Sequence, residues 1–180
     1  MIRYQDNFLS EDELDDLSQI FNHTLNFKMN EVLPHDQIEC DPLDNHQFVH
    51  SIVESGGKSK VVSPHFPLFK KLFLNKLNCK RCERMKINIT SRTSTPIEHG
   101  YHTDFWDVSD TDIKMSTAIY YFNTCDGYTG IKTKKGSIKK IESVENRICI
   151  FPPHWRHTGT TTSNSRFRTV LNIVYEEYHD

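Results

Sequence analysis

The feature that most constrains the fold of this chain is a change in the spacing of its apolar residues near residue 80. Before it, the apolar residues from Leu14 to Leu25 recur at helical spacing, behind a Ser10–Glu13 segment with the pattern of a helix capping box. After it, apolar and polar residues alternate from Met85 to Thr90, which is the period of a strand with one buried face. Helices followed by several short strands predict an α+β fold whose β part is a barrel or a sandwich.

The same patterns predict further elements. We expect a loop from Asn30 to Asp44, a short helix from His46 to Glu54, and another helix from Pro64 to about Asn78. The strands and turns expected later in the chain are 117–122, a turn at Asp126-Gly127, a turn at Lys135-Gly136, 147–151 and 168–175.

The composition excludes some classes of protein. The 180 residues carry a net charge of −2, so no overall basic excess marks a nucleic-acid binder, and we do not expect nucleic acid as a partner. The sequence has no apolar run of about 18 residues and no secretory signal at its start, which predicts no membrane span and a cytoplasmic location. Because it has no repeat or low-complexity tract, we expect a single domain over 1–180, with helical support in 1–80 and a β core in 81–180.

The five cysteines are scattered and odd in number, which suits a reducing compartment better than a disulfide scaffold. Cys79 and Cys82 form a Cys-x-x-Cys pair. A tetrahedral zinc site would need two more ligands at similar spacing, and the sequence has no second pair. We therefore interpret the two residues as ordinary cysteines near a helix end.

The strongest candidate for chemistry is His102-Thr-Asp104. On an extended chain, residues two apart point the same way, so this imidazole and carboxylate can face one ion. A second imidazole would complete a triad that holds Fe(II) on one face and leaves the other positions open. With 10 histidines and 13 aspartates in the chain, chance supplies about 0.7 matches to His-x-Asp, so the motif gains weight only from its place between predicted strands.

Three histidines follow Asp104 and could supply the second imidazole. His179 is next to the C-terminus, and His154 directly follows a proline in a predicted turn. His157 begins a polar stretch shortly before the last predicted strand. We therefore select His157 as the third ligand.

Arg166 and Arg168, at the start of the last predicted strand, are candidate anchors for a carboxylate, which arginine binds through paired hydrogen bonds. Because they are two residues apart, they could share a face of that strand. Most arginines are exposed, so we expect one of the two to be solvated.

Five segments, taken in their order along the chain, resemble the 2-oxoglutarate/Fe(II)-dependent oxygenase superfamily in its prolyl-hydroxylase-like branch. They are also similar to small oxygenases encoded by bacteriophages. The segments that carry the resemblance are His102-Thr-Asp104, Thr117–Asn123, Asn146–Pro152, His157-Thr-Gly159 and Arg168–Asn172. They cover roughly residues 85–175. The polar loop Ser91–Gly100 has no pattern that indicates a peptide-binding lid, which puts the substrate in doubt more than the reaction.

The resemblance implies a double-stranded β-helix (jelly-roll) core with N-terminal helices packed against it. It implies that His102, Asp104 and His157 bind Fe(II), the metal that would react with O₂. It also implies that Arg168, or Arg166 as the alternative, pairs with the 5-carboxylate of the cosubstrate 2-oxoglutarate. Two weaker expectations concern the cosubstrate site: Tyr121 either bonds the same carboxylate or is a core aromatic residue, and Asn88 faces the cosubstrate.

The implied activity is hydroxylation of a substrate that the sequence does not identify, with a peptidyl proline as the family default and a protein or peptide as the corresponding partner. Three alternatives stay open. A cupin-type metal protein, acting as an isomerase or as a dioxygenase without 2-oxoglutarate, would need a fourth ligand and would give Arg168 no task. A non-catalytic binding protein would not need the intact triad. A nucleic-acid-modifying oxygenase of the same superfamily could use the lysines of segment 132–140, although a solvated turn explains them more simply.

Overall fold

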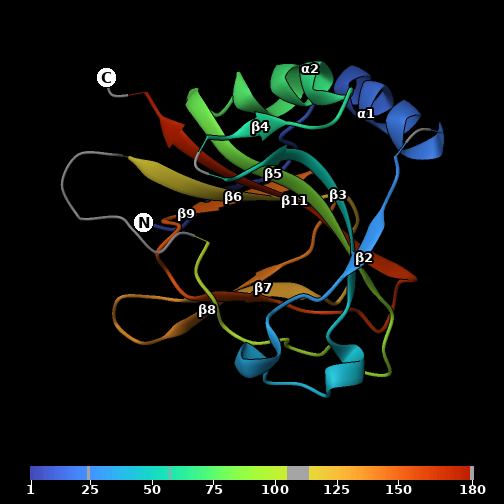
Figure 1. Ribbon diagram of the computed structural model, residues 1–180, viewed down its shortest axis with the longest axis vertical. Coiled ribbons are helices and arrows are strands. Elements are labelled where there is room, and N and C mark those ends of the chain that lie inside the picture. Colours follow the sequence, from blue (N-terminus) through green and yellow to red (C-terminus); the bar gives the residue numbers. More distant parts are fainter. Residues whose placement is uncertain (24, 57, 105–113, 179–180) are drawn as a thin grey trace.

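The computed structural model describes residues 1–23, 25–56, 58–104 and 114–178, and in these ranges the strands form two antiparallel sheets (Figure 1). The larger sheet has the strand order β1-β9-β6-β11-β5-β3-β2, with β4 paired to β3, and the smaller has the order β10-β7-β8. The elements are β1 (Arg3–Gln5), α1 (Glu11–His23), β2 (Lys28–Asn30), the 3₁₀ turns η1 (His35–Gln37) and η2 (Pro42–Asp44), β3 (Gln47–Glu54), β4 (Lys60–Val61), α2 (Phe66–Phe69), the single π-turn η3 (Lys70–Leu74), β5 (Cys79–Ser91), β6 (Met115–Tyr121), β7 (Tyr128–Lys132), β8 (Ile138–Glu142), β9 (Arg147–Phe151), β10 (His157–Gly159) and β11 (Phe167–Glu177).

Two apolar clusters hold these layers together. The helices α1 and α2 lie over one face of the larger sheet (Figure 1), where Leu17, Phe73 and Ile87 belong to one buried cluster. The second cluster lies between the two sheets and includes Ile119 of β6 and Ile131 of β7. This arrangement confirms the predicted α+β fold with a double-stranded β-helix core and helices packed outside it. In the described ranges, no helix has both the length and the apolar character that crossing a bilayer requires.

The segment His46–Glu54, which we expected to be helical, is instead strand β3, so that prediction is wrong. The strand pairs with β5, and a bulge shifts their register between Ser51 and Val53. The extra residue interrupts strict alternation, so the apolar residues at 49, 52 and 53 mimic helical spacing. The first 80 residues therefore contribute strands β1 to β4 as well as helices.

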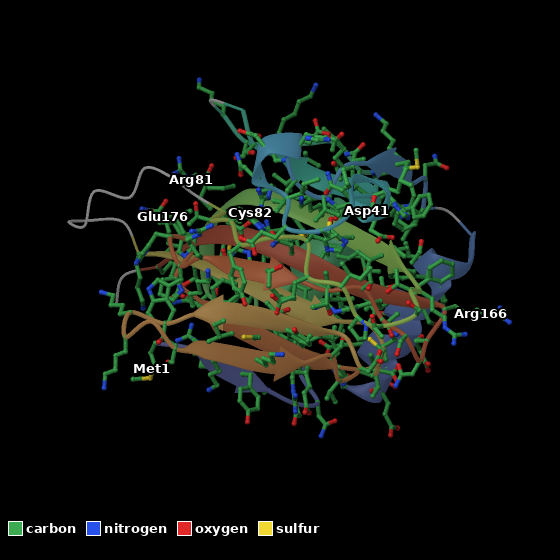
Figure 2. All side chains as sticks on the ribbon, turned by 90° about the horizontal axis from the view of Figure 1, so that it is seen from below. Met1, Asp41, Arg81, Cys82, Arg166 and Glu176 are labelled. Atoms are coloured by element: carbon green, nitrogen blue, oxygen red, sulfur yellow. The ribbon has the colours of Figure 1, made fainter. Side chains whose placement is uncertain are left out.

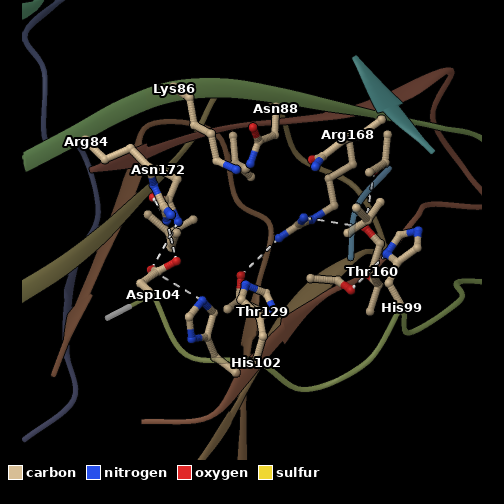
Figure 3. Close-up of a pocket in the computed structure, with 17 residues that line it drawn as sticks. Arg84, Lys86, Asn88, His99, His102, Asp104, Thr129, Thr160, Arg168 and Asn172 are labelled. Carbon is tan, nitrogen blue, oxygen red and sulfur yellow. Dashed lines mark hydrogen bonds and ion pairs between the residues drawn. The ribbon is translucent and has the colours of Figure 1, made fainter. Parts of the chain in front are cut away.

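The two faces of β5 have different surroundings. Met85 and Ile87 point toward the helices, whereas Lys86 and Asn88 point into a cavity between the sheets (Figure 3). The predicted alternation is confirmed, and its polar half faces this cavity instead of bulk solvent.

Cys79 and Cys82 lie within β5, where Cys82 is next to Arg81, whose side chain pairs with Glu176 of β11 (Figure 2). All five cysteines, which fall in the described ranges, are free. Burial raises the pKa of the Cys79 thiol to about 11 and that of the Cys82 thiol to about 12. Both thiols therefore stay protonated at neutral pH and are poor nucleophiles.

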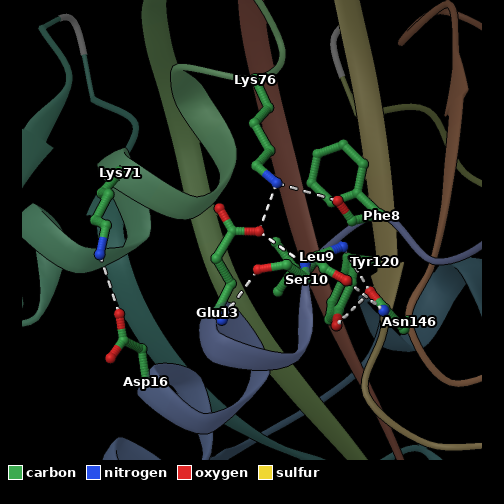
Figure 4. Close-up of polar contacts among 9 residues, drawn as sticks. All are labelled: Phe8, Leu9, Ser10, Glu13, Asp16, Lys71, Lys76, Tyr120 and Asn146. Carbon is green, nitrogen blue, oxygen red and sulfur yellow. Dashed lines mark hydrogen bonds and ion pairs between the residues drawn. The ribbon is translucent and has the colours of Figure 1, made fainter.

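The predicted capping box begins helix α1. The Ser10 N–H donates to Glu13 Oε2 at 2.9 Å, and the Glu13 N–H donates to Ser10 Oγ at 3.4 Å (Figure 4). Lys76 joins this end of the helix to the α2–η3 segment, because its Nζ donates to Glu13 Oε2 at 2.6 Å and to the Phe8 carbonyl at 3.2 Å.

Asn146, in the turn before β9, fastens the segment before α1 to the larger sheet. Its Oδ1 accepts from the Leu9 N–H at 2.8 Å and from the Tyr120 hydroxyl at 3.2 Å, and its Nδ2 donates to the Leu9 carbonyl at 2.8 Å (Figure 4). The residue is buried and has a φ of +59°, a left-handed conformation that asparagine tolerates better than most residues.

We expect Asn146→Gly to lower the free energy of unfolding by about 2–3 kcal/mol, because three buried hydrogen bonds are lost while glycine keeps the backbone conformation. Urea unfolding measures the change. The matched control is Asn78→Gly, since Asn78 also has a positive φ (+52°) but is exposed. Equal stabilities of the two variants would contradict this role for Asn146.

Candidate metal and cosubstrate site

The three predicted metal ligands meet at one end of the cavity between the sheets. The segment after β5 carries His102 and Asp104, and β10 carries His157. The His102 N–H donates to the His157 carbonyl at 3.0 Å, and the His157 N–H donates back to the His102 carbonyl at 2.8 Å. The two ring centroids are 4.5 Å apart, and His157 Nε2 is 3.5 Å from Asp104 Oδ2. One ligand atom from each residue lies within 4.8 Å of the others, so the three can bind a single ion.

Neighbouring groups prepare both histidines for metal binding. His157 Nδ1 is 3.1 Å from the carbonyl oxygen of Trp155, a distance that suits an Nδ1–H donor. In that tautomer the Nε2 lone pair, on the side of Asp104, is free to bind a metal. Burial lowers the pKa of His102 to about 4, so its ring is neutral at neutral pH and is also able to act as a ligand.

Residues from three strands hold Asp104. Thr117 Oγ1 of β6 donates to its Oδ2 at 2.8 Å, Asn172 Nδ2 of β11 donates to the same oxygen at 3.3 Å, and Arg84 of β5 forms an ion pair with Oδ1. Burial alone raises the pKa of this carboxyl, but His157 and Arg84 outweigh that effect and hold the pKa below its usual value. Asp104 is therefore a buried anion with a fixed orientation.

The cavity has a volume of about 80 Å³ and a largely polar lining (Figure 3). The residues that line it are Val32, Gln47, Arg84, Lys86, Asn88, Thr90, His99, His102, Asp104, Ile119, Thr129, His157, Gly159, Thr160, Arg168, Val170 and Asn172.

Arg168 lies in the cavity away from Asp104 (Figure 3) and is only 3% exposed. Its guanidinium donates to Thr129 Oγ1 at 3.0 Å and to the Thr160 carbonyl at 3.4 Å. In the described part of the chain no carboxylate pairs with it, and its Nε has no hydrogen-bond partner. Gly127 makes room for it, because a Cβ there would be 2.5 Å from Arg168 Cδ. A buried cation without a counter-ion is costly, which favours an anionic ligand at this position.

The two candidate arginines are separated by the fold. Arg166 precedes β11, is exposed, and extends from the edge of the molecule (Figure 2). It does not line the cavity. Among the candidate third ligands, His154 is exposed and outside the triad, whereas His179 lies outside the described residues.

The two weaker candidates differ in position. Asn88 lines the cavity, and its Oδ1 has no hydrogen-bond partner within the described ranges. Tyr121 is fully buried outside the lining. Its hydroxyl donates to Thr129 Oγ1 at 2.9 Å, and the Arg168 guanidinium is 5.6 Å from its ring centroid. In this structure Tyr121 therefore holds Thr129 through a hydrogen bond and packs against the Arg168 guanidinium.

The sequence interpretation missed several polar residues of the site, namely Arg84, Lys86, His99, Thr129 and Asn172. A signal for some of them was present. Positions 84, 86, 88 and 90 share one face of β5, and positions 168 and 172 share one face of β11, by the two-residue period of a strand. An unusually polar strand face next to the His-x-Asp motif could have indicated a cavity.

The comparisons with known proteins identify the fold. No protein-family model matches the chain, and no curated protein sequence matches it. Among solved structures, an oxidoreductase of the 2OG-Fe(II) oxygenase family from Burkholderia pseudomallei matches with a TM-score of 0.68 and 16% identity, over 99% of this chain and 86% of that chain. A Pseudomonas putida prolyl-4-hydroxylase matches with a TM-score of 0.60 and 14% identity, over 98% and 92% of the two chains.

HygX from Streptomyces hygroscopicus, solved with nickel and 2-oxoglutarate bound, matches with a TM-score of 0.61 and 9% identity, over 98% of this chain and 82% of that chain. The chain therefore has the fold of the 2-oxoglutarate/Fe(II) oxygenases, and it contains a His-Asp-His group that is consistent with an Fe(II) site.

We expect Thr117→Val to weaken metal binding by about tenfold, because this nearly isosteric change removes a hydrogen bond that orients Asp104. Calorimetric titration with Mn(II) or Co(II) measures the affinity. Ser116→Ala is the matched control, since Ser116 is the next residue along β6 and donates to Glu177 instead. An unchanged affinity in Thr117→Val would contradict the role of this hydrogen bond.

Proposed function

We propose that this chain is an Fe(II)- and 2-oxoglutarate-dependent dioxygenase that hydroxylates a C–H bond of its substrate. One observation carries the proposal: a single small cavity has three metal-ligating side chains at one end and a buried, unpaired arginine farther along (Figure 3). 2-Oxoglutarate has matching chemistry, because its keto acid end can chelate a metal and its other end is a carboxylate.

The residues present suit the metal. Two neutral imidazoles and one carboxylate are a preferred donor set for non-haem Fe(II), and three protein ligands leave positions for other molecules. When bound, the metal and the cosubstrate supply the oxidising chemistry, in which O₂ is consumed, 2-oxoglutarate is converted to succinate and CO₂, and a hydroxyl group is added to the substrate. In the superfamily that the sequence resembles, halogenating members have a small residue at the position of Asp104, so its carboxylate favours hydroxylation.

The protein's own residues supply positioning. Arg168 would bind the 5-carboxylate of 2-oxoglutarate through its free N–H groups, and Thr129 keeps the guanidinium in place. Tyr121 fixes Thr129 in turn. Asn88 presents an amide to the same cavity. Burial of these groups excludes water and strengthens each electrostatic contact with the cosubstrate.

A cupin-type metal protein is less well supported. A cupin would add a fourth protein ligand, and in the described residues the metal-ligating group contains three. It would also leave the buried charge of Arg168 without a counter-ion. The structural neighbours do not identify the substrate of this chain, since a prolyl-4-hydroxylase and HygX both share the fold. A peptidyl proline stays one candidate among several.

The proposal is tested by incubating the purified protein with Fe(II), 2-oxoglutarate and O₂ and measuring succinate. We expect succinate formation in the wild type and a loss of at least about 100-fold in His157→Ala, which removes a metal ligand. His154→Ala is the matched control, because this exposed histidine lies three residues away and outside the triad. The absence of succinate in the wild type, together with no visible absorption band on anaerobic addition of Fe(II) and 2-oxoglutarate, would overturn the proposal.

We expect Arg168→Met to raise the KM for 2-oxoglutarate by about 30-fold or more, because the cosubstrate carboxylate would lose its buried cation. Arg166→Met should leave that KM unchanged, since Arg166 is exposed and outside the cavity. Initial rates of succinate formation at varied 2-oxoglutarate give both values. The reverse order of effects would assign the carboxylate to Arg166.

A further inference from the structure

The cavity contains a second cation that the proposed cosubstrate does not require. Lys86 lies between Arg84 and Asn88 on the cavity face of β5, and its side chain points into the cavity (Figure 3). It is paired in register with Asn172 of β11, which donates to the metal-ligating Asp104. Lys86 is therefore beside the triad end of the cavity.

Lys86 has no ionic partner in the part of the chain that the structure describes. Its neighbour Arg84 is ion-paired with Asp104, whereas no carboxylate of the described residues lies within 4.0 Å of the Lys86 ammonium group. Burial, and then the charge of Arg84, lower the pKa of Lys86 to about 8 against a smaller opposing effect of Asp104, so the side chain is still mainly protonated at neutral pH. A largely buried lysine that forms no salt bridge is costly to maintain, which favours an anionic ligand.

The charge of the cavity supports the same conclusion. With the histidines neutral, the described residues that line it include three cations (Arg84, Lys86 and Arg168) and one anion (Asp104), an excess of two positive charges. A divalent metal and the dianion 2-oxoglutarate together add no net charge. The loaded cavity would keep the same excess, and a neutral substrate would leave it uncompensated.

We propose that Lys86 binds a carboxylate of the substrate that is oxidised, so that the substrate is a small carboxylic acid, such as a free amino acid. This inference rests on the proposed function. It separates the two cations: Arg168 binds the cosubstrate, and Lys86 binds the substrate next to the metal ligands. A prolyl residue within a peptide has no carboxylate of its own for Lys86 to bind.

The test uses the protein loaded with Mn(II) and N-oxalylglycine, an unreactive analogue of 2-oxoglutarate, and ¹³C-labelled acetate as a minimal carboxylate. Paramagnetic relaxation of the acetate signal reports binding near the metal. We expect saturable relaxation in the wild type and in Lys86→Arg. In Lys86→Met we expect the affinity for acetate to fall by about tenfold or more. Lys60→Met, at an exposed lysine of β4, is the matched control and should behave as the wild type.

The affinity for N-oxalylglycine is measured in the same samples, and it also shows that each variant is folded. Three results would overturn the inference: no saturable acetate relaxation in loaded wild type, equal acetate affinity in Lys86→Met and wild type, or a loss of N-oxalylglycine affinity in Lys86→Met as large as that in Arg168→Met. The last result would make Lys86 a cosubstrate ligand. Failure of wild type to bind N-oxalylglycine with Mn(II) is a different outcome, which would overturn the proposed function and this inference with it.

Discussion

The buried carboxylate of Asp104 is the group on which the candidate site depends. An isolated carboxylate in the protein interior is strongly disfavoured, and here Arg84, Thr117 and Asn172 compensate for the loss of water. These three residues belong to β5, β6 and β11, the central strands of the larger sheet. The carboxylate thus joins the segment after β5 to the sheet, while paired backbone hydrogen bonds hold His102 opposite His157.

The two faces of the larger sheet have different roles: the outer face stabilises the domain, and the inner face carries the residues of the candidate site. Its outer face packs against the helices through a continuous apolar cluster, which can stabilise the domain without any contribution from the site. Its inner face has apolar residues where it meets the smaller sheet, such as Ile119, and polar residues where the cavity lies, such as Asn88. Because strand residues alternate between faces, the polar residues are present without interrupting the outer cluster.

How far the sequence predicts this structure depends on whether local pattern or tertiary contact decides the position. The period of β5 and the capping box of α1 are local, and both were predictable. The helix expected at 46–54 failed because a bulge in β3 changed the apparent period. Arg166 and Arg168 could share a face only if both were in the strand, but β11 begins at Phe167, so strand alternation fixes Arg168 alone.

The cations of the cavity could not be inferred from local pattern, because a polar strand face is normally solvated. Lys86 alternates with apolar residues in the same way whether water or a second sheet covers that face. Only the tertiary position of β10 and the His102 segment makes this face of β5 the wall of a cavity. Two cations at different places in one small cavity then require two anionic groups that are held apart. In a 2-oxoglutarate whose keto acid end is bound to the metal, the metal would compensate the charge of the 1-carboxylate and Arg168 that of the 5-carboxylate, so the charge of Lys86 is left for another molecule.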